Sequence, residues 1–237
     1  MTDAPYEDPD DDGAESAPTS VELAASLAAR LCHDLISPAS AIVSGVDLLE
    51  DPSAADMRDD ALNLIGASAR KLVAVLAFAR VAFGASASAE SFRSDELHKL
   101  TEGVFAPLRP TLDWAVRPTE LPKAAARALL NLAQLGSGAV ATGGVVRLTA
   151  AVEGDAVLMA AECTGPRPRL RPEVVSGLRG EPLGEGLMHG HWVQAFYLHG
   201  LLAASGGSVD ATAADDRVTL RARAPLGEEN SSGSTAP

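Results

Sequence analysis

The chain has 237 residues and 24.3 kDa, room for one large domain or two small ones, with 19 basic against 32 acidic residues. A net charge of −13 has the wrong sign for neutralising phosphate groups, so we expect no nucleic-acid partner. No apolar run approaches the ~20 residues of a membrane span, and the acidic N-terminus does not resemble a secretion signal, so we expect a cytoplasmic protein with no membrane contact.

Both ends of the chain are expected to be disordered. Residues 1–18 are rich in aspartate, glutamate and proline, and residues 228–237 are mostly small and polar, with three serines and two glutamates. Neither composition can bury enough apolar surface to fold. The two cysteines, Cys32 and Cys163, are far apart, which indicates neither a disulfide framework nor a thiolate zinc site.

The first folded segment, 19–84, is predicted to be a helical hairpin. Thr19 and Glu22 have the spacing of a capping box, and a helical pattern runs from there to Glu50. A second apolar pattern with three- and four-residue spacing follows Pro52 and ends at Gly84. Because two such helices leave part of their apolar surface uncovered, we expect a homodimer in which two hairpins form a four-helix bundle.

A second domain is predicted over residues 85–227, after a linker rich in glycine, serine and alanine. Helical patterns cover 95–107, 122–135 and 191–204, and strand patterns cover 111–116, 145–153, 156–162 and 217–223. Glu153, Gly154 and Asp155 fit the turn of a hairpin between the middle two strands. The whole chain is therefore expected to be α+β, a helical hairpin followed by an α/β sandwich.

His33 lies on the wrong face of the first helix for a core residue. At ~100° per residue it is about 160–180° from the apolar stripe, so it is either an exposed residue without a specific role or a reactive group. Small residues accompany it on that face, and Pro38 leaves the Asp34 carbonyl without an intrahelical donor. The stripe comprises Leu27, Leu31, Leu35, Ile42, Val46 and Leu49, and the small residues are Ser26, Ala29, Ser37, Ser40 and Ser44.

Asp34 can make that histidine a nucleophile. A carboxylate that accepts from one ring N–H fixes the imidazole tautomer and stabilises the cation formed when the other nitrogen reacts. The sequence alone does not separate this role from that of a solvated acid.

The segment HisAspLeuIleSerPro, 33–38, resembles the phosphorylated motif of two-component histidine kinases. The wider string 27–45, with 56–60, 81–90 and 171–174, resembles the ChpT-type histidine phosphotransferases of alphaproteobacteria over residues 19–226. The resemblance implies a dimerisation and phosphotransfer bundle followed by a degenerate GHKL-type ATPase domain. It further implies that His33 is the phosphorylated residue and Asp34 its orienting acid.

The same resemblance implies the partners. Phosphate would pass from an aspartyl phosphate on the receiver domain of a hybrid kinase to His33, and then to the aspartate of response-regulator receivers in a cell-cycle phosphorelay. Magnesium would sit in the partner receiver and not in this chain. We expect partner contacts from Arg30, Ser37, Ser40 and Ser44; kinases with phosphatase activity often carry Thr or Asn at the position of Ser37.

An ATP-dependent histidine kinase is the main alternative, and a non-enzymatic receiver-binding scaffold is another. Asn131 matches the metal-binding asparagine of such kinases, but residues 162–170 lack the DxGxG turn and carry Glu162 in place of its aspartate. Residues 177–186 could be the remnant of an ATP lid. Since proline follows the first glycine, we expect neither ATP binding nor autokinase activity.

The remaining candidate groups lie in the second domain. Arg167, Arg169 and Arg171 form a basic cluster in an acidic chain, which indicates either a solvated loop or a docking patch for the acidic surface of a receiver. His189 and His191 lack a third ligand at metal-binding spacing, so no metal site is expected.

Overall fold

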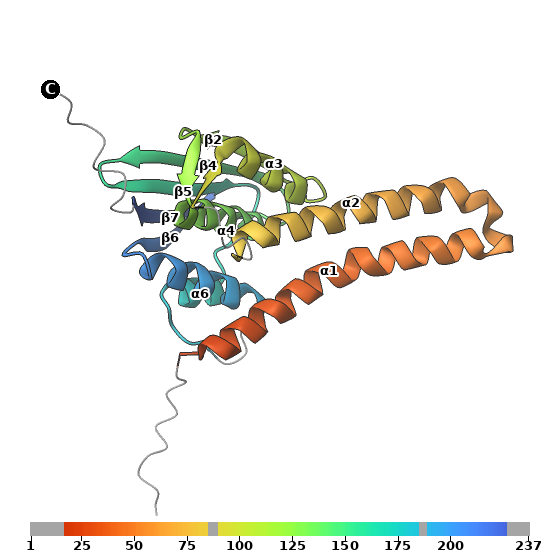
Figure 1. Cartoon of the computed structure of the whole chain (residues 1–237), viewed down its shortest axis with the longest axis horizontal. Coiled ribbons are helices and arrows are strands. Elements are labelled where there is room, and N and C mark those ends of the chain that lie inside the picture. The colour runs from red at the N-terminus through yellow and green to blue at the C-terminus, as the bar shows by residue number, and fades with distance from the viewer. Residues whose placement is uncertain (1–16, 85–89, 185–188, 227–237) are drawn as a thin grey trace, which may run out of the picture.

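A computed structural model of the chain describes residues 17–84, 90–184 and 189–226. A long helical hairpin projects from a sheet domain that packs around its base (Figure 1). Helix α1 spans Ser20–Glu50, a 3-10 helix η1 spans Pro52–Met57, and α2 spans Arg58–Ala82. The predicted hairpin is confirmed, whereas nearly all of the two predicted disordered tails and of the linker lies outside the described residues.

The ends of α1 are fixed by the side chains that the sequence places there. Thr19 Oγ1 accepts from the Glu22 backbone N–H at 3.3 Å, and Glu22 Oε2 accepts from the Thr19 N–H at 2.8 Å, which completes the predicted capping box. At the other end the Asp51 carboxylate accepts from the Ser53 N–H at 2.8 Å and so caps η1. Pro38 lies inside α1, which continues past it.

The hairpin buries little of its apolar surface. In α1 only Pro38 and Gly45 are fully buried, and Val46 of the predicted buried stripe is 40% exposed. The expectation that this stripe forms a core is therefore only partly met in a single chain. Among helices in the described part of the chain, only the stretch Pro52–Ala82 is long and apolar enough to span a bilayer by length and composition, and it is one arm of this hairpin, interrupted by Arg70 and Lys71.

The second domain is a five-stranded sheet with helices on one face. The sheet has the order β2-β4-β5-β7-β6, and β2 runs parallel to β4 while the other neighbours are antiparallel. A separate two-stranded sheet joins β1 to β3. The strands are β1 Ser91–Arg93, β2 Pro110–Val116, β3 Glu120–Pro122, β4 Gly144–Glu153, β5 Ala156–Thr164, β6 Ser208–Ala214 and β7 Arg217–Pro225; the helices are α3 Ser94–Phe105, α4 Lys123–Ala139, α5 Pro172–Leu178 and α6 His189–Ala203.

Most of these elements were predicted, including the β4–β5 hairpin, whose turn residue Gly154 has φ of +60°. The sequence pattern missed α5, β6 and the two short strands β1 and β3. The α/β sandwich is confirmed, although α4 extends to Ala139, four residues beyond its predicted end.

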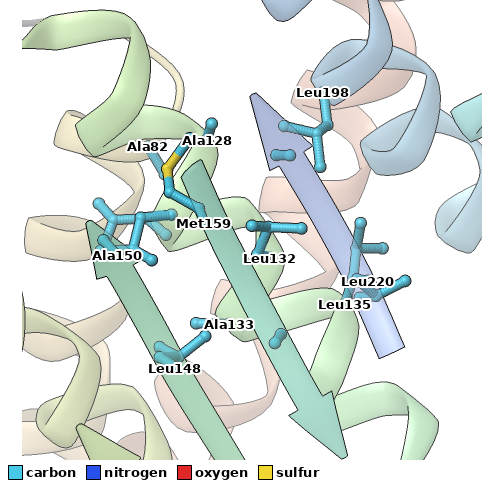
Figure 2. Close-up of a cluster of buried hydrophobic side chains, with 14 of the residues drawn as sticks. Ala82, Ala128, Leu132, Ala133, Leu135, Leu148, Ala150, Met159, Leu198 and Leu220 are labelled. Atoms are coloured by element: carbon cyan, nitrogen blue, oxygen red, sulfur yellow. The ribbon is translucent and has the colours of Figure 1, made fainter. Parts of the chain in front are cut away.

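The core of this domain lies between α4 and the sheet. Figure 2 shows Leu132, Ala133 and Leu135 of α4 in one cluster with Leu148 of β4 and Met159 of β5. Ala82, the last residue of α2, lies in the same cluster. The base of the hairpin is therefore built into the core of the second domain and is not joined to it by a linker alone.

Candidate functional site

The structure places His33 on the open surface of α1, as its helical phase predicted. Its side chain is 86% exposed, and its Nδ1 lies 3.3 Å from Asp34 Oδ1. A ring whose Nδ1–H donates to a carboxylate carries its lone pair on Nε2. In that tautomer the free lone pair lies on Nε2 of a freely accessible imidazole.

Asp34 is shared between His33 and Arg30. The second carboxylate oxygen, Oδ2, lies 3.9 Å from Arg30 Nε one helical turn earlier. The Arg30 side chain is only 17% exposed, and its Nη1 donates to the backbone carbonyl of Gly190 in the first turn of α6. Burial lowers the pKa of Arg30 and the charge of Asp34 opposes that shift, but a guanidinium so basic stays charged at neutral pH.

The start of α6 makes a second contact with α1. His189 Nε2 lies 2.6 Å from Ser26 Oγ, and the His189 ring packs against Trp192 with centroids 5.4 Å apart. Trp192 is held in turn by its indole N–H, which donates to the Glu181 carbonyl at 2.9 Å. Helix α6 is thus fixed against the N-terminal part of α1 (Figure 1).

His191 faces the charges of both regions. Its pKa is lowered from 6.5, first by burial and then by the positive charges of Arg171 and Arg30, while Glu173 and Asp34 act in the opposite direction. The imidazole is therefore held neutral at pH 7 between two guanidinium groups.

A cleft of about 370 Å³ separates the His33 face of the hairpin from the second domain. Residues from α1, α2, the end of α3, α4 and the loop before α5 line it. Among the predicted partner-binding residues, Arg30, Ser37, Arg169 and Arg171 line this cleft together with His33 and Asp34. The Arg169 backbone N–H donates to the Ala139 carbonyl at 2.8 Å, which fixes the loop to the end of α4.

The other predicted partner-binding residues lie outside the lining of this cleft. Ser40 and Ser44 are exposed one and two turns further along α1, and Arg167 is exposed in the loop before Arg169. The predicted basic cluster is therefore divided, with two of its three arginines beside His33. The predicted serine row continues from the cleft towards the tip of the hairpin.

Asn131, the residue that matches the kinase metal ligand, is fully buried and engaged in hydrogen bonds. Its Nδ2 donates to the carbonyls of Arg127 at 2.9 Å and Ala82 at 3.3 Å. Its Oδ1 accepts from Gln194 Nε2 at 3.2 Å. The side chain therefore ties the end of α2 to α4 and α6.

Glu162, predicted to stand in place of the adenine-binding aspartate of kinases, lies on strand β5. Residues of β5 alternate between the two faces of the sheet, so that Cys163 faces α4 and Glu162 lies on the opposite face. The Cys163 thiol contacts the helix near Gly136, and burial raises its pKa to about 12. A neutral thiol thus stands on the helix-facing side of β5, and the Glu162 carboxylate lies on the other side of the sheet.

Within the described residues no group of three His, Cys, Asp or Glu side chains could hold a metal ion. His189 and His191 belong instead to the contact between α6 and α1. Sequence reasoning missed this contact, because His189 and Ser26 are 163 residues apart. The available signal was an apolar helical pattern that begins with two histidines and no acidic residue.

Comparison with known proteins shows which family this chain resembles. Residues 94–217 match the family model of the histidine phosphotransferase C-terminal domain. The protein phosphotransferase ChpT of Brucella abortus (strain 2308) is 34% identical over 203 residues, which cover 83% of this chain and 94% of that protein.

A solved phosphotransferase structure also resembles this chain. A bacterial phosphotransferase superposes with a TM-score of 0.77 and 28% identity, covering 87% of this chain and 98% of that one. The catalytic domain of the histidine kinase ThkA is more distant, with a TM-score of 0.46, 14% identity, and coverage of 57% of this chain and 94% of that one. The chain therefore belongs to the ChpT family of histidine phosphotransferases, which are protein phosphotransferases of two-component phosphorelays.

Proposed function

We propose that His33 is the phosphorylated residue of this phosphotransferase and that its partners are receiver domains. The observation that carries the proposal is the exposed imidazole whose Nδ1 is held by Asp34. The donor would be the aspartyl phosphate of a hybrid-kinase receiver, and the acceptor would be the aspartate of a response-regulator receiver. The role in cell-cycle control is proposed from the family resemblance.

Phosphotransfer to His33 needs little more than an exposed imidazole oriented by Asp34. The lone pair of His33 Nε2 attacks phosphorus in line with the bond to the receiver's aspartate, an N–P bond forms, and the carboxylate leaves with the bonding electrons. The Nδ1 proton stays on the ring, where the Asp34 carboxylate stabilises the resulting imidazolium. The second transfer is the reverse step on another receiver. The chain's own task is to present and orient the imidazole.

The cleft supports receiver docking beside His33. Arg169 and Arg171 supply positive charge there in a chain whose net charge is −13. A receiver surrounds its phosphorylatable aspartate with acidic groups, so complementary charge would speed encounter and fix orientation. Arg167, Ser37, Ser40 and Ser44 would extend the same surface, and Mg²⁺ would be held by the receiver.

The residues of the second domain support a donor other than ATP. Asn131 Oδ1 already accepts from Gln194, so the side chain would have to break buried hydrogen bonds to hold a metal ion. Glu162, in place of the aspartate expected of a kinase, lies on the face of the sheet that points away from α4. We therefore propose that this domain binds no nucleotide and serves to dock receivers.

The apolar surface of the hairpin supports a homodimer. Gly45 and Ala61 are buried, and the next residue on each helix, Val46 and Leu62, is exposed. Each exposed residue lies ~100° further round its helix than the buried residue before it. Because the two helices are antiparallel, both exposed side chains point to the same side of the hairpin. On α1 this side is roughly 140° away from His33. Two hairpins packed through this side would form a four-helix bundle with the two His33 side chains facing outwards, in the cytoplasm where receiver proteins are found.

The test is phosphotransfer from a purified, radiolabelled receiver phosphate to the full chain. We expect His33→Ala to abolish transfer, since no other nucleophile replaces the imidazole, while the circular dichroism spectrum and the dimer are unchanged. His98→Ala is the matched control, because that imidazole stacks on Trp114 at 4.9 Å in the second domain and should leave transfer intact. Transfer that survives in His33→Ala would refute the assignment.

A further inference from the structure

Arg30 joins the pair formed by His33 and Asp34 to the second domain. Arg30 was predicted to contact a partner protein, and its side chain is largely buried between α1 and α6. One end of its guanidinium is held by the Gly190 carbonyl, and the other end, Nε, points to Asp34 Oδ2 at 3.9 Å. The position of the Arg30 guanidinium is therefore set by α6, which belongs to the second domain.

We propose that Arg30 is a positioning residue for phosphotransfer, through which the first turn of α6 fixes the Asp34 carboxylate against His33. The proposal rests on the proposed function of His33 and adds a task for the second domain beyond docking. The chain of contacts runs from the Gly190 carbonyl to Arg30, from Arg30 to Asp34 Oδ2, and from Asp34 Oδ1 to His33 Nδ1.

The geometry of Asp34 shows why such support is needed. A carboxylate half-exposed on a helix can rotate about its side-chain bonds, and each rotamer presents a different oxygen to the histidine. Arg30 offers a fixed positive charge to one oxygen, so that the other oxygen is directed at Nδ1. Because Arg30 Nε has no hydrogen-bond partner among the described residues, Asp34 can approach it without displacing another acceptor.

The contact of α6 with α1 makes Arg30 a rigid support. His189 binds Ser26 one turn before Arg30, and the buried Trp192 anchors the same turn of α6 in the second domain. A side chain fixed at both ends loses little conformational entropy when it orders Asp34. The second domain would thus contribute to the reaction at His33 without touching the reacting atoms.

The experiment uses potassium phosphoramidate as a small phosphodonor, so that receiver docking plays no part. Attack by His33 Nε2 forms the N–P bond and releases ammonia. With the full chain we expect Arg30→Gln to lower the rate of His33 phosphorylation about tenfold and to move its pH dependence, because the charge that holds Asp34 is lost. Arg30→Lys keeps the charge and should recover most of the rate.

The controls separate positioning from folding and from the proposed function itself. Arg147→Gln breaks another Arg–Asp pair, 2.7 Å long and far from His33, and should react like the unmodified chain. If Arg30→Gln is unfolded by circular dichroism, the double variant Ser26→Ala, His189→Ala, which loosens α6 but keeps the guanidinium, should show a smaller loss of rate. Wild-type rates and pH profiles in both variants would overturn this inference, whereas an unmodified chain that takes no phosphate on His33 would overturn the proposed function.

Discussion

The hairpin and the sheet domain differ in how far each completes its own core. Helix α1 fully buries two of its 31 residues, whereas α4 buries eleven of its 17. The sheet domain therefore holds its fold through internal packing, and the outer part of the hairpin leaves apolar side chains uncovered. The hairpin, which carries His33, therefore depends on packing against other elements. These are α6 on one side and, in our proposal, a second hairpin on the other.

The largest effect on stability is expected in the sheet domain. Leu148 is fully buried beneath α4, so Leu148→Ala removes core contacts and leaves a cavity. We expect the free energy of unfolding to fall by about 3 kcal/mol in chemical denaturation. Leu158→Ala, on the exposed side of the neighbouring strand, should cost less than about 1 kcal/mol. Equal losses would contradict the account of a one-sided core.

A charge on the hairpin should instead affect self-association. Val46→Asp places a carboxylate on the uncovered apolar side, and a symmetric dimer carries the change twice. We expect the dimer dissociation constant to rise about a hundredfold in sedimentation equilibrium while each chain stays folded. Val145→Asp, equally exposed at 39% on the sheet, is the matched control and should leave the dimer intact. Dimerisation unaffected by Val46→Asp would place the interface elsewhere.

The smallest effect is expected where the two regions meet, at His191. Its folded-state pKa lies below the unfolded value of 6.5, so its contribution to stability is present above that pH and is lost as the pH falls through the folded pKa. Acidification below about pH 6 should therefore destabilise the chain, as a charged imidazole would face Arg30 and Arg171. Thermal unfolding of His191→Gln should depend less on pH over this window, and identical pH profiles would exclude the contribution of His191.

The sequence predicted the regular parts of the molecule because periodic burial and capping are local signals. Thr19 and Glu22 define the start of α1, and the phase of His33 alone predicted its exposure. It missed α5, with seven residues, and β6, an edge strand of small and polar residues, because neither carries a clear apolar period.

The support for the site could not be predicted in the same way. Arg30 and Gly190 are 160 residues apart, and no spacing rule links a helix to the first turn of another element so distant. Asn131 is the converse case, since its position matches a kinase metal ligand while its amide joins three parts of the fold. Whether such a side chain binds a ligand or holds two elements of the fold together is decided by tertiary packing.

The central claim is that His33 receives phosphate from a receiver and not from ATP. The most direct measurement incubates the full chain with radiolabelled Mg-ATP and, separately, with a radiolabelled phosphorylated receiver, and maps acid-labile, base-stable label. We predict label on His33 from the receiver alone. Label from ATP alone would contradict our account of Asn131 and Glu162, and label on another residue, or none from the receiver, would contradict the assignment of His33.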